Sequence, residues 1–309
     1  MIRRALVTGA AGFIGRHVCK QLASQGWQVA GIGLGDWSPA EQRAWGLRAW
    51  RNEGISGEAL EALARSEGEP ELLIHCAGGS SVPFSLAHPR EDFGQTVVTI
   101  ADALEFARRR EGGMAFVYPS SAAVYGRVAG RPVSEATPLR PVSPYGLHKR
   151  MAEELCQSCA ASGKVPAAII RLFSVYGAGL RKQLLWDACA KAAAGAFVFS
   201  GTGGEIRDWI HVSDAAALLV LAATKAAPDC PVVNGGTGEG TSIREVLERL
   251  GGWWTPAQTP VFSGAQRPGD PDCYIADVSA VRSWGYRPQA DLDAGLQDYI
   301  RWFRTERGA

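Results

Sequence analysis

The sequence predicts an α/β fold in which a doubly wound parallel sheet is followed by a smaller, discontinuous C-terminal domain. Through the first half of the chain, short apolar runs alternate with helix-length stretches, which is typical of a parallel sheet covered on both faces. A glycine-rich turn follows the first apolar run, and after about residue 173 the alternation gives way to loop-rich stretches. With 309 residues, 46% of them hydrophobic, the chain can bury a large core.

The elements of the first half follow from their apolar runs and the residues that end them. Gly26 fits a helix stop after the first helix. The expected strands are Ala5–Thr8, Gln28–Ile32, Leu72–Cys76, Ala115–Pro119 and Ala167–Leu172, and the expected helices are Phe13–Ser24, Gly57–Arg65, Asp92–Arg110 and Tyr145–Ser162. The stretch Gly33–Glu53, rich in tryptophan and glycine, receives no assignment.

The second half is expected to serve both domains. The predicted elements are helices at Gln183–Ala194, Ser213–Thr224, Ile243–Leu250 and Leu292–Arg304, a strand at Val232–Val233, and loops at Gly177–Arg181 and Ser200–Arg207. We therefore expect a larger domain at 1–173 together with about 208–236. The smaller domain is expected at 174–207 and 237–309.

Composition excludes several classes of function. A formal net charge of +1, with acidic and basic residues interspersed, argues against a broad nucleic-acid or membrane surface. No apolar run approaches a membrane span, and the chain goes directly into its first strand without a signal peptide, so we expect a cytoplasmic protein. Seven cysteines without framework spacing suit free thiols. Cys156 and Cys159 are interpreted as structural thiols rather than a redox or zinc pair, and no metal site is expected.

The glycine-rich turn predicts dinucleotide binding. Gly9, Gly12 and Gly15 follow the first strand and open the first helix. Glycines at this spacing allow a tight turn, close approach of the backbone to a pyrophosphate, and close packing of the helix on the strand. The exposed amides and the helix dipole then favour the phosphates.

Tyr145 and Lys149 form a candidate proton-transfer pair. If the stretch after Pro144 is helical, these positions share one face. A lysine ammonium near a phenol favours the phenolate and lowers a pKa that is ordinarily about 10. A phenol adjusted toward working pH is a usable general acid or base. Ser121 lies upstream in Pro-Ser-Ser-Ala-Ala-Val-Tyr-Gly.

Together, these motifs make the chain resemble the extended short-chain dehydrogenase/reductases, the nucleotide-sugar epimerases and dehydratases. The resemblance spans essentially the whole chain. It rests on Thr-Gly-x-x-Gly-Phe-Ile-Gly, His75-Cys-Ala-Gly78, Ser-Ser-Ala-Ala-Val-Tyr-Gly, Ser-Pro-Tyr-Gly-x-x-Lys, Arg171-Leu-Phe-Ser-Val-Tyr-Gly, Arg207-Asp-Trp-Ile-His-Val and Arg267-Pro-Gly-Asp270. It implies a Rossmann-type dinucleotide-binding domain and a nucleotide-sugar-binding domain.

The resemblance implies a role for each matching residue. Ser121 would hydrogen-bond the sugar oxygen, Tyr145 would act as acid/base, and Lys149 would hold the nicotinamide ribose. The implied cofactor residues are Gly9, Ala11, Gly12, Phe13, Ile14, Gly15, Arg16, Gly33, Ala77, Gly78, Tyr145 and Lys149. The implied substrate residues are Ser121, Ser174, Arg181, Phe199, Arg207, Arg267 and Asp270. Arg207 and Arg267 would grip the diphosphate, a role that suits the guanidinium.

The cofactor could be NAD or NADP. Most NAD-using relatives end the second strand in an acidic residue that holds the adenosine ribose, but here Gly33 occupies that position and Asp36 follows three residues later. Losing a carboxylate removes the repulsion that would exclude a ribose 2′-phosphate. Arg16 is a candidate phosphate partner, or an exposed helix arginine.

Ala122 and Ala123 reduce the number of reactions that the resemblance allows. Related 4,6-dehydratases and decarboxylases carry carboxylates at these positions, so their absence disfavours both reactions. The leading hypothesis is inversion at C4 of a nucleoside-diphosphate hexose, with uridine the expected base. The alternatives are an NADPH-dependent 4-keto-sugar reductase, which Gly33 favours, and a non-catalytic dinucleotide sensor, which the complete catalytic trio disfavours.

Two further expectations come from the resemblance. Ser174 with Arg181 resembles the pair that handles the carboxylate in uronate 4-epimerases, although Arg181 and Lys182 could instead face solvent or phosphate. Relatives often dimerise through the two helices that match Asp92–Arg110 and Tyr145–Ser162, so a homodimer is expected.

Overall fold

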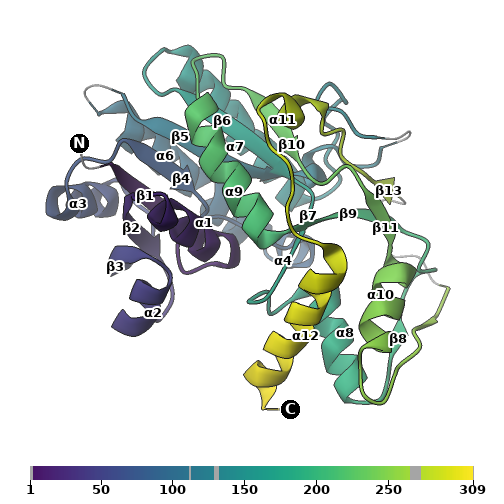
Figure 1. Ribbon diagram of the computed structural model, residues 1–309. Helices are drawn as coiled ribbons and strands as arrows, with labels where there is room; N and C mark the ends of the chain where they lie inside the picture. Colours follow the sequence, from purple (N-terminus) through teal and green to yellow (C-terminus); the bar gives the residue numbers. More distant parts are fainter. Residues whose placement is uncertain (1–2, 111–112, 129–131, 265–272, 309) are drawn as a thin grey trace. The chain divides into compact units, whose positions relative to one another are not determined.

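The computed structural model describes residues 3–110, 113–128, 132–264 and 273–308. They fall into two compact units (Figure 1). The first unit comprises Met1–Gly126, Pro138–Leu172 and Ala215–Val233, and the second comprises Arg127–Thr137, Phe173–Asp214 and Asn234–Ala309. Among the described residues, no helix is long and apolar enough to span a bilayer.

A seven-stranded sheet forms the centre of the first unit, counted over the described residues. Its order is β10-β6-β5-β4-β1-β2-β3. The strands are β1 (Arg4–Thr8), β2 (Gln28–Gly33), β3 (Leu47–Asn52), β4 (Leu72–His75), β5 (Ala115–Ser121), β6 (Ala167–Leu172) and β10 (Val232–Gly235). The pairings from β3 through to β6 are parallel, which confirms the predicted sheet. Strand order reverses between β1 and β4, and such a switch point places ligands at the carboxyl ends of the strands.

Helices cover both faces of this sheet. They are α1 (Phe13–Ser24), α2 (Pro39–Ala44), α3 (Gly57–Glu67), α4 (Val82–Ala87), α5 (Pro89–Phe93), α6 (Thr99–Arg108), α7 (Pro144–Ala161) and α9 (Val212–Ala222), with short turns η1 (Gly94–Val98), η2 (Ala122–Val124) and η3 (Ala223–Lys225). One core joins α3, α6 and α7 to residues such as Phe116, Tyr118 and Ile169 on one sheet face. Helices α1 and α9 lie over the opposite face (Figure 1).

Two local features of the first unit differ from the sequence prediction. The expected helix Asp92–Arg110 is divided into α5, the π-helical turn η1 and α6. The unassigned stretch contains α2 and β3. Helix α2 is only six residues long, so it shows no apolar periodicity, but Ser38 and Glu41 form a capping box that stabilises its start.

A four-stranded sheet organises the second unit, again counted over the described residues. Its strands are β7 (Ser174–Tyr176), β9 (Ile206–His211), β11 (Gly240–Ser242) and β13 (Cys273–Tyr274), and β8 (Val198–Phe199) pairs with β12 (Val261–Phe262). The helices are α8 (Gln183–Ala193), α10 (Ile243–Gly252), α11 (Ser279–Ser283) and α12 (Leu292–Arg307). Aromatic rings join three of them: Phe303 of α12 packs edge-on against Trp186 of α8 at 4.9 Å between centroids, and against Trp254 after α10 at 6.2 Å.

The boundary between the units departs from the expected one in two places. Residues 127–137 and 208–214 were expected in the larger domain and lie in the second unit. Strand β9 pairs with β7, β11 and β13 rather than with the large sheet. Val133 exchanges backbone hydrogen bonds with the strand-like segment that follows β13, at Ile275 and Asp277. Both segments are thus held by long-range pairing, which local sequence does not reveal.

Candidate active site

The glycine-rich turn between β1 and α1 forms a backbone cradle with no room for side chains. Gly9 has a φ of +63°, and a Cβ on it would lie 2.7 Å from the Ala77 nitrogen. A Cβ on Gly15 would lie 2.1 Å from the Gly9 oxygen. No described side chain caps the start of α1, and its first turn holds no acidic residue. These residues fit a dinucleotide, because the helix N-terminus and its amides remain available to phosphate.

Other predicted cofactor residues line the same end of the sheet. Phe13 and Ile14 begin α1 and are half-buried, and Ala77 and Gly78 follow β4. Thr8 ties these two strand ends together: its Oγ1 lies 2.9 Å from Nδ1 of His75 and accepts a hydrogen bond from the Ala77 amide. Burial lowers the pKa of His75 to about 3, so this histidine is a neutral packing residue.

Gly33 ends β2 in a backbone conformation that disfavours any side chain. Its φ is +156°, and a Cβ there would lie 3.2 Å from the Gly9 Cα. Asp36 is exposed, and its Oδ1 lies 3.4 Å from Nδ2 of Asn52 at the end of β3. The carboxylate nearest to β2 in sequence is therefore held at the neighbouring strand rather than at the strand end.

Arg16 lies against the cofactor turn. Its Nη2 donates to the Ala11 carbonyl at 2.7 Å, and its Nε donates to the Gly12 carbonyl at 3.4 Å. The guanidinium carbon lies 5.6 Å from the ring centroid of Trp37 and 5.4 Å from that of Trp45. A cation is thus fixed beside the turn that the sequence assigns to the cofactor.

Ser121, Tyr145 and Lys149 come together at the carboxyl end of β5. Ser121 ends that strand and hydrogen-bonds the Tyr145 side chain. Helix α7 begins with Ser143 as its N-cap and Pro144 at its first position, which places Tyr145 and Lys149 one turn apart. Nζ of Lys149 lies 5.9 Å from the Tyr145 ring centroid and donates to the Pro119 carbonyl at 3.1 Å. The trio can therefore exchange a proton with one substrate oxygen.

The pKa of Tyr145 moves opposite to the sequence prediction. Burial raises it, the hydrogen bond with Ser121 acts to lower it, and the charge of Asp92 raises it further. Burial also lowers the pKa of Lys149 to about 8. The expected lowering of the phenol pKa by Lys149 is thus outweighed by desolvation in the protein alone.

Two buried polar contacts around the trio were not predicted. His148 of α7 places Nδ1 2.6 Å from Oδ2 of Asp92. Glu153 of α7 receives a bidentate contact from Arg171 of β6, with Nη2 to Oε2 at 2.7 Å and Nε to Oε1 at 3.0 Å. Because the partners are far apart in the sequence, no local pattern could have paired them.

The surroundings of the cysteine pair within α7 indicate a structural role. Cys156 is fully buried in the core under the sheet, and burial raises its pKa well above the ordinary range. Cys159 is half-buried, and all seven cysteines are free thiols. Across the described residues, no group of three or more His, Cys, Asp or Glu side chains could hold a metal ion.

Two of the predicted substrate residues, Arg207 and Ser174, lie on the four-stranded sheet of the second unit. Arg207 on β9 is half-buried and donates to the Ile206 carbonyl at 2.9 Å. In register, it is paired with Thr241 and with Tyr274. Ser174 starts β7 opposite Trp209 and is half-buried. Arg267 and Asp270 lie outside the described residues.

Arg181 and Phe199 have surroundings that favour structural roles. Arg181 is exposed and pairs with Glu306 of α12, with Nη2 to Oε1 at 2.7 Å. Its guanidinium also lies 5.6 Å from the Trp302 ring centroid. Phe199 is 4% exposed and packs edge-on against Phe197 at 4.8 Å. Neither a free guanidinium nor an open ring face is presented to a ligand.

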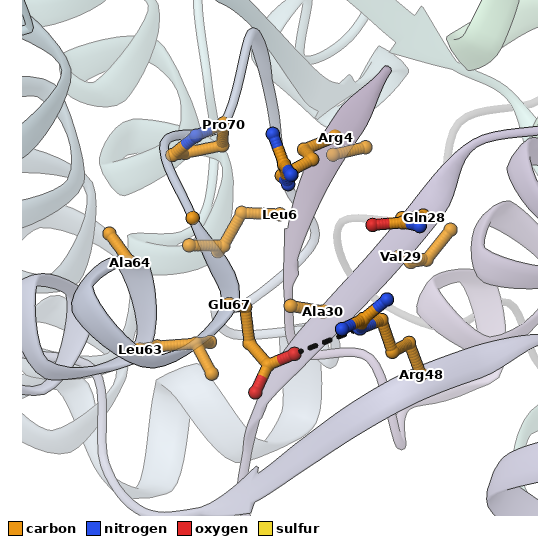
Figure 2. A pocket seen from close by; sticks show the side chains of 12 residues that line it. Arg4, Leu6, Gln28, Val29, Ala30, Arg48, Leu63, Ala64, Glu67 and Pro70 are labelled. Atoms are coloured by element: carbon orange, nitrogen blue, oxygen red, sulfur yellow. Dashed lines mark hydrogen bonds and ion pairs between the residues drawn. The ribbon is translucent and has the colours of Figure 1, made fainter. Parts of the chain in front are cut away.

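A small pocket at the opposite end of the large sheet is not a candidate for the cofactor. Figure 2 shows it lined by Arg4, Gln28, Leu63 and Glu67, with an ion pair between Arg48 and Glu67 across one side. Arg4 and Gln28 are the first residues of β1 and β2. The pocket therefore lies at the amino ends of the strands, away from the glycine-rich turn.

The sequence matches a known family over most of its length. Residues 5–235 match the family described as the NAD dependent epimerase/dehydratase family. A UDP-glucose 4-epimerase from Azospirillum brasilense is 31% identical over 98% of this chain and 92% of its own. A second, from Bacillus subtilis, is 29% identical over 96% of both chains.

Solved structures of similar proteins share the whole fold. A UDP-glucose-4-epimerase from Stenotrophomonas maltophila with bound NAD and formylated UDP-arabinopyranose is 27% identical, with a TM-score of 0.88 over 99% of this chain and 100% of that chain. A UDP-glucuronic acid 4-epimerase from Bacillus cereus, in complex with UDP-glucuronic acid and NAD, is 25% identical with a TM-score of 0.85, covering 98% of this chain and 99% of that one.

Proposed function

Because the chain belongs to the NAD-dependent epimerase/dehydratase family of extended short-chain dehydrogenases, we propose that it inverts C4 of a nucleoside-diphosphate hexose through a transient 4-keto intermediate. The observation that carries this proposal is the assembly of Ser121, Tyr145 and Lys149 at the carboxyl end of β5. NAD, the cofactor named in the solved relatives, would accept a hydride from C4 and return it to the opposite face.

The residues of this chain would handle the proton. Tyr145 takes the proton of the 4-hydroxyl as C4 loses hydride, and it returns the proton when the hydride comes back. Ser121 donates a hydrogen bond to the developing carbonyl oxygen. Lys149, held by the Pro119 carbonyl, supplies a positive charge on the same side of Tyr145.

Ala122 and Ala123 support epimerisation over elimination. Both follow Ser121 in the turn η2, and their methyl groups offer no acid or base. A 4,6-elimination needs such a group to remove the C5 proton and to protonate the leaving oxygen. The keto intermediate is therefore expected to be reduced rather than dehydrated.

The substrate is proposed to be a uridine diphosphate sugar. The relatives are named as UDP-glucose and UDP-glucuronic acid epimerases. Arg207, and Arg267 beyond the described residues, would hold the diphosphate because a guanidinium suits phosphate oxygens. Ser174 is proposed to contact the sugar.

Turnover on a panel of UDP-sugars tests the proposal. Purified protein incubated with UDP-glucose, UDP-galactose or UDP-glucuronic acid should produce the C4 epimer without net consumption of cofactor. Tyr145→Phe should lose turnover by about 10²-fold or more while keeping nucleotide binding. An active Tyr145→Phe enzyme contradicts the assignment of Tyr145.

A 4-keto-sugar reductase is the second candidate, and Gly33 favours it. Without a carboxylate at the end of β2, NADPH would meet no repulsion at its 2′-phosphate. One equivalent of NADPH oxidised per product formed would identify this activity and exclude epimerisation.

The proposal also covers the cellular location and the oligomeric state of the protein. The seven free thiols support a reducing compartment, and we place the protein in the cytoplasm. Exposed apolar side chains on α5, η1 and α7 support a homodimer.

A further inference from the structure

Asp92 and His148 form a buried pair beside the catalytic residues. Asp92 on α5 has no exposed surface, and its Oδ2 lies 2.6 Å from Nδ1 of His148 on α7. Phe93 packs edge-on against the His148 ring, with centroids 5.4 Å apart, and so fixes the orientation of the ring. A carboxylate buried this completely needs hydrogen-bond donors, and the imidazole ring can supply one N–H.

The other oxygen of Asp92 points toward the loop after β4. Within the described residues Oδ1 has no hydrogen-bond partner, and a Cβ on Gly79 would lie 2.0 Å from it. A Cβ on the neighbouring Gly78 would lie 3.8 Å from Nζ of Lys149. The Asp92 carboxylate and the catalytic lysine therefore border the same pair of glycines.

Asp92 acts electrostatically on both catalytic groups. Its negative charge raises the pKa of Tyr145 and that of Lys149. Glu153 also acts on Lys149, but Arg171 compensates the Glu153 charge through its bidentate contact. The titratable groups around Asp92 and the trio are His75 of β4, Cys76 directly after it, Tyr118 of β5, and Tyr145, His148, Lys149, Glu153 and Cys156 of α7.

We propose that Asp92 and His148 are positioning residues that tune proton transfer at Tyr145 and Lys149. The negative charge of Asp92 favours the protonated forms of Tyr145 and Lys149, and the contact with His148 keeps that carboxylate beside them. The inference rests on the proposed function because it assumes that Tyr145 transfers the substrate proton.

The pH dependence of kcat/KM for C4 epimerisation tests this proposal. Asp92→Asn keeps the size of the side chain and removes its charge, so both limbs of the profile should move to lower pH, by on the order of one pH unit. His148→Gln keeps the Asp92 charge and a hydrogen-bond donor toward it, so its profile should stay close to that of the wild type. Glu105→Gln is the matched control, because it removes the same charge from an exposed pair on α6 and should shift nothing.

A second measurement does not require turnover. The absorbance of tyrosinate near 295 nm, taken as the difference between a protein and its Tyr145→Phe counterpart, reports the ionisation of Tyr145. This ionisation should occur at lower pH in Asp92→Asn than in the wild type.

The outcomes separate the two proposals. An inactive wild type whose Tyr145 ionisation still shifts would remove the epimerase assignment and retain the role of the pair. An active enzyme whose profile only falls in height, or moves the same way in both variants, would overturn the role of the pair. If Asp92→Asn does not fold, Asp92→Ser, which also lacks the charge, replaces it: a profile or a Tyr145 ionisation that does not move to lower pH overturns the proposal.

Discussion

At the scale of a single residue, the burial of Lys149 disfavours the positive charge that its proposed role requires. It is 6% exposed, and burial lowers its pKa from 10.5 to about 8. Between these two pH values the unfolded chain holds a proton that the folded protein has released. The free energy of unfolding therefore rises with pH across this window, and the buried ammonium destabilises the fold below it.

We expect Lys149→Met to remove this pH dependence. The free energy of unfolding of the wild type, relative to the variant, should rise between pH 8 and pH 10, by up to about 3 kcal/mol. Urea unfolding of both proteins at several pH values measures this difference in the free energy of unfolding. Lys20→Met, which removes an exposed lysine of α1, is the control and should give no such trend. A difference that stays constant with pH contradicts the prediction.

A second prediction at this scale concerns the role of Arg16 in the choice between NAD and NADP. Its guanidinium is fixed beside Ala11, and the end of β2 offers no carboxylate. If a ribose 2′-phosphate binds there, Arg16→Gln should weaken NADP binding about tenfold or more and change NAD binding little. Calorimetric titration with both nucleotides tests this, with Lys20→Gln as a control for loss of charge on α1. NAD bound far more tightly than NADP by the wild type would exclude the phosphate role.

Helix α7 shows what the sequence reveals about an element and what it does not. The sequence predicts a helix at Tyr145–Ser162, and the structure confirms it at Pro144–Ala161, with Ser143 as the N-cap. By contrast, β3 and α2 escaped prediction because one carries charged residues within a strand and the other is only six residues long. The π-helical turn between α5 and α6 escaped because its residues have ordinary helical spacing.

Two glutamates of α7 allow a matched test of element stability. Glu153 is 1% exposed, and Arg171 of β6 is its cationic partner. Glu153→Gln would leave a buried guanidinium uncompensated and should lower the free energy of unfolding by about 3–5 kcal/mol. Glu154 pairs with Arg150 on the exposed face of the same helix. Glu154→Gln should cost less than about 1 kcal/mol. Equal losses in urea unfolding would contradict the structural role of the buried pair.

At the scale of the whole molecule, the active site is partly encoded in local motifs. The glycine-rich turn and the spacing of Tyr145 and Lys149 each lie within one short segment, so the sequence predicts them. The contact of Asp92 with His148 spans 56 residues, and it forms only because α5 and α7 pack together. The burial that raises the pKa of Tyr145 likewise depends on the surrounding fold. Local sequence therefore specifies the reacting groups, while long-range packing sets their electrostatics.

Assembly into a homodimer is the prediction that concerns the whole molecule. Phe93 of α5, Val98 of η1 and Leu147 of α7 are 37%, 48% and 46% exposed, and their helices pack against one another within the first unit. Exposed apolar groups gathered on neighbouring helices suit a self-complementary interface. Leu147→Glu would place a charge in that interface, so light scattering should show a dimeric wild type and a monomeric variant. Val261→Glu changes a side chain that is 58% exposed on β12 and should leave the dimer intact. A wild type that remains monomeric at high concentration, or a Leu147→Glu variant that remains dimeric, would exclude this interface.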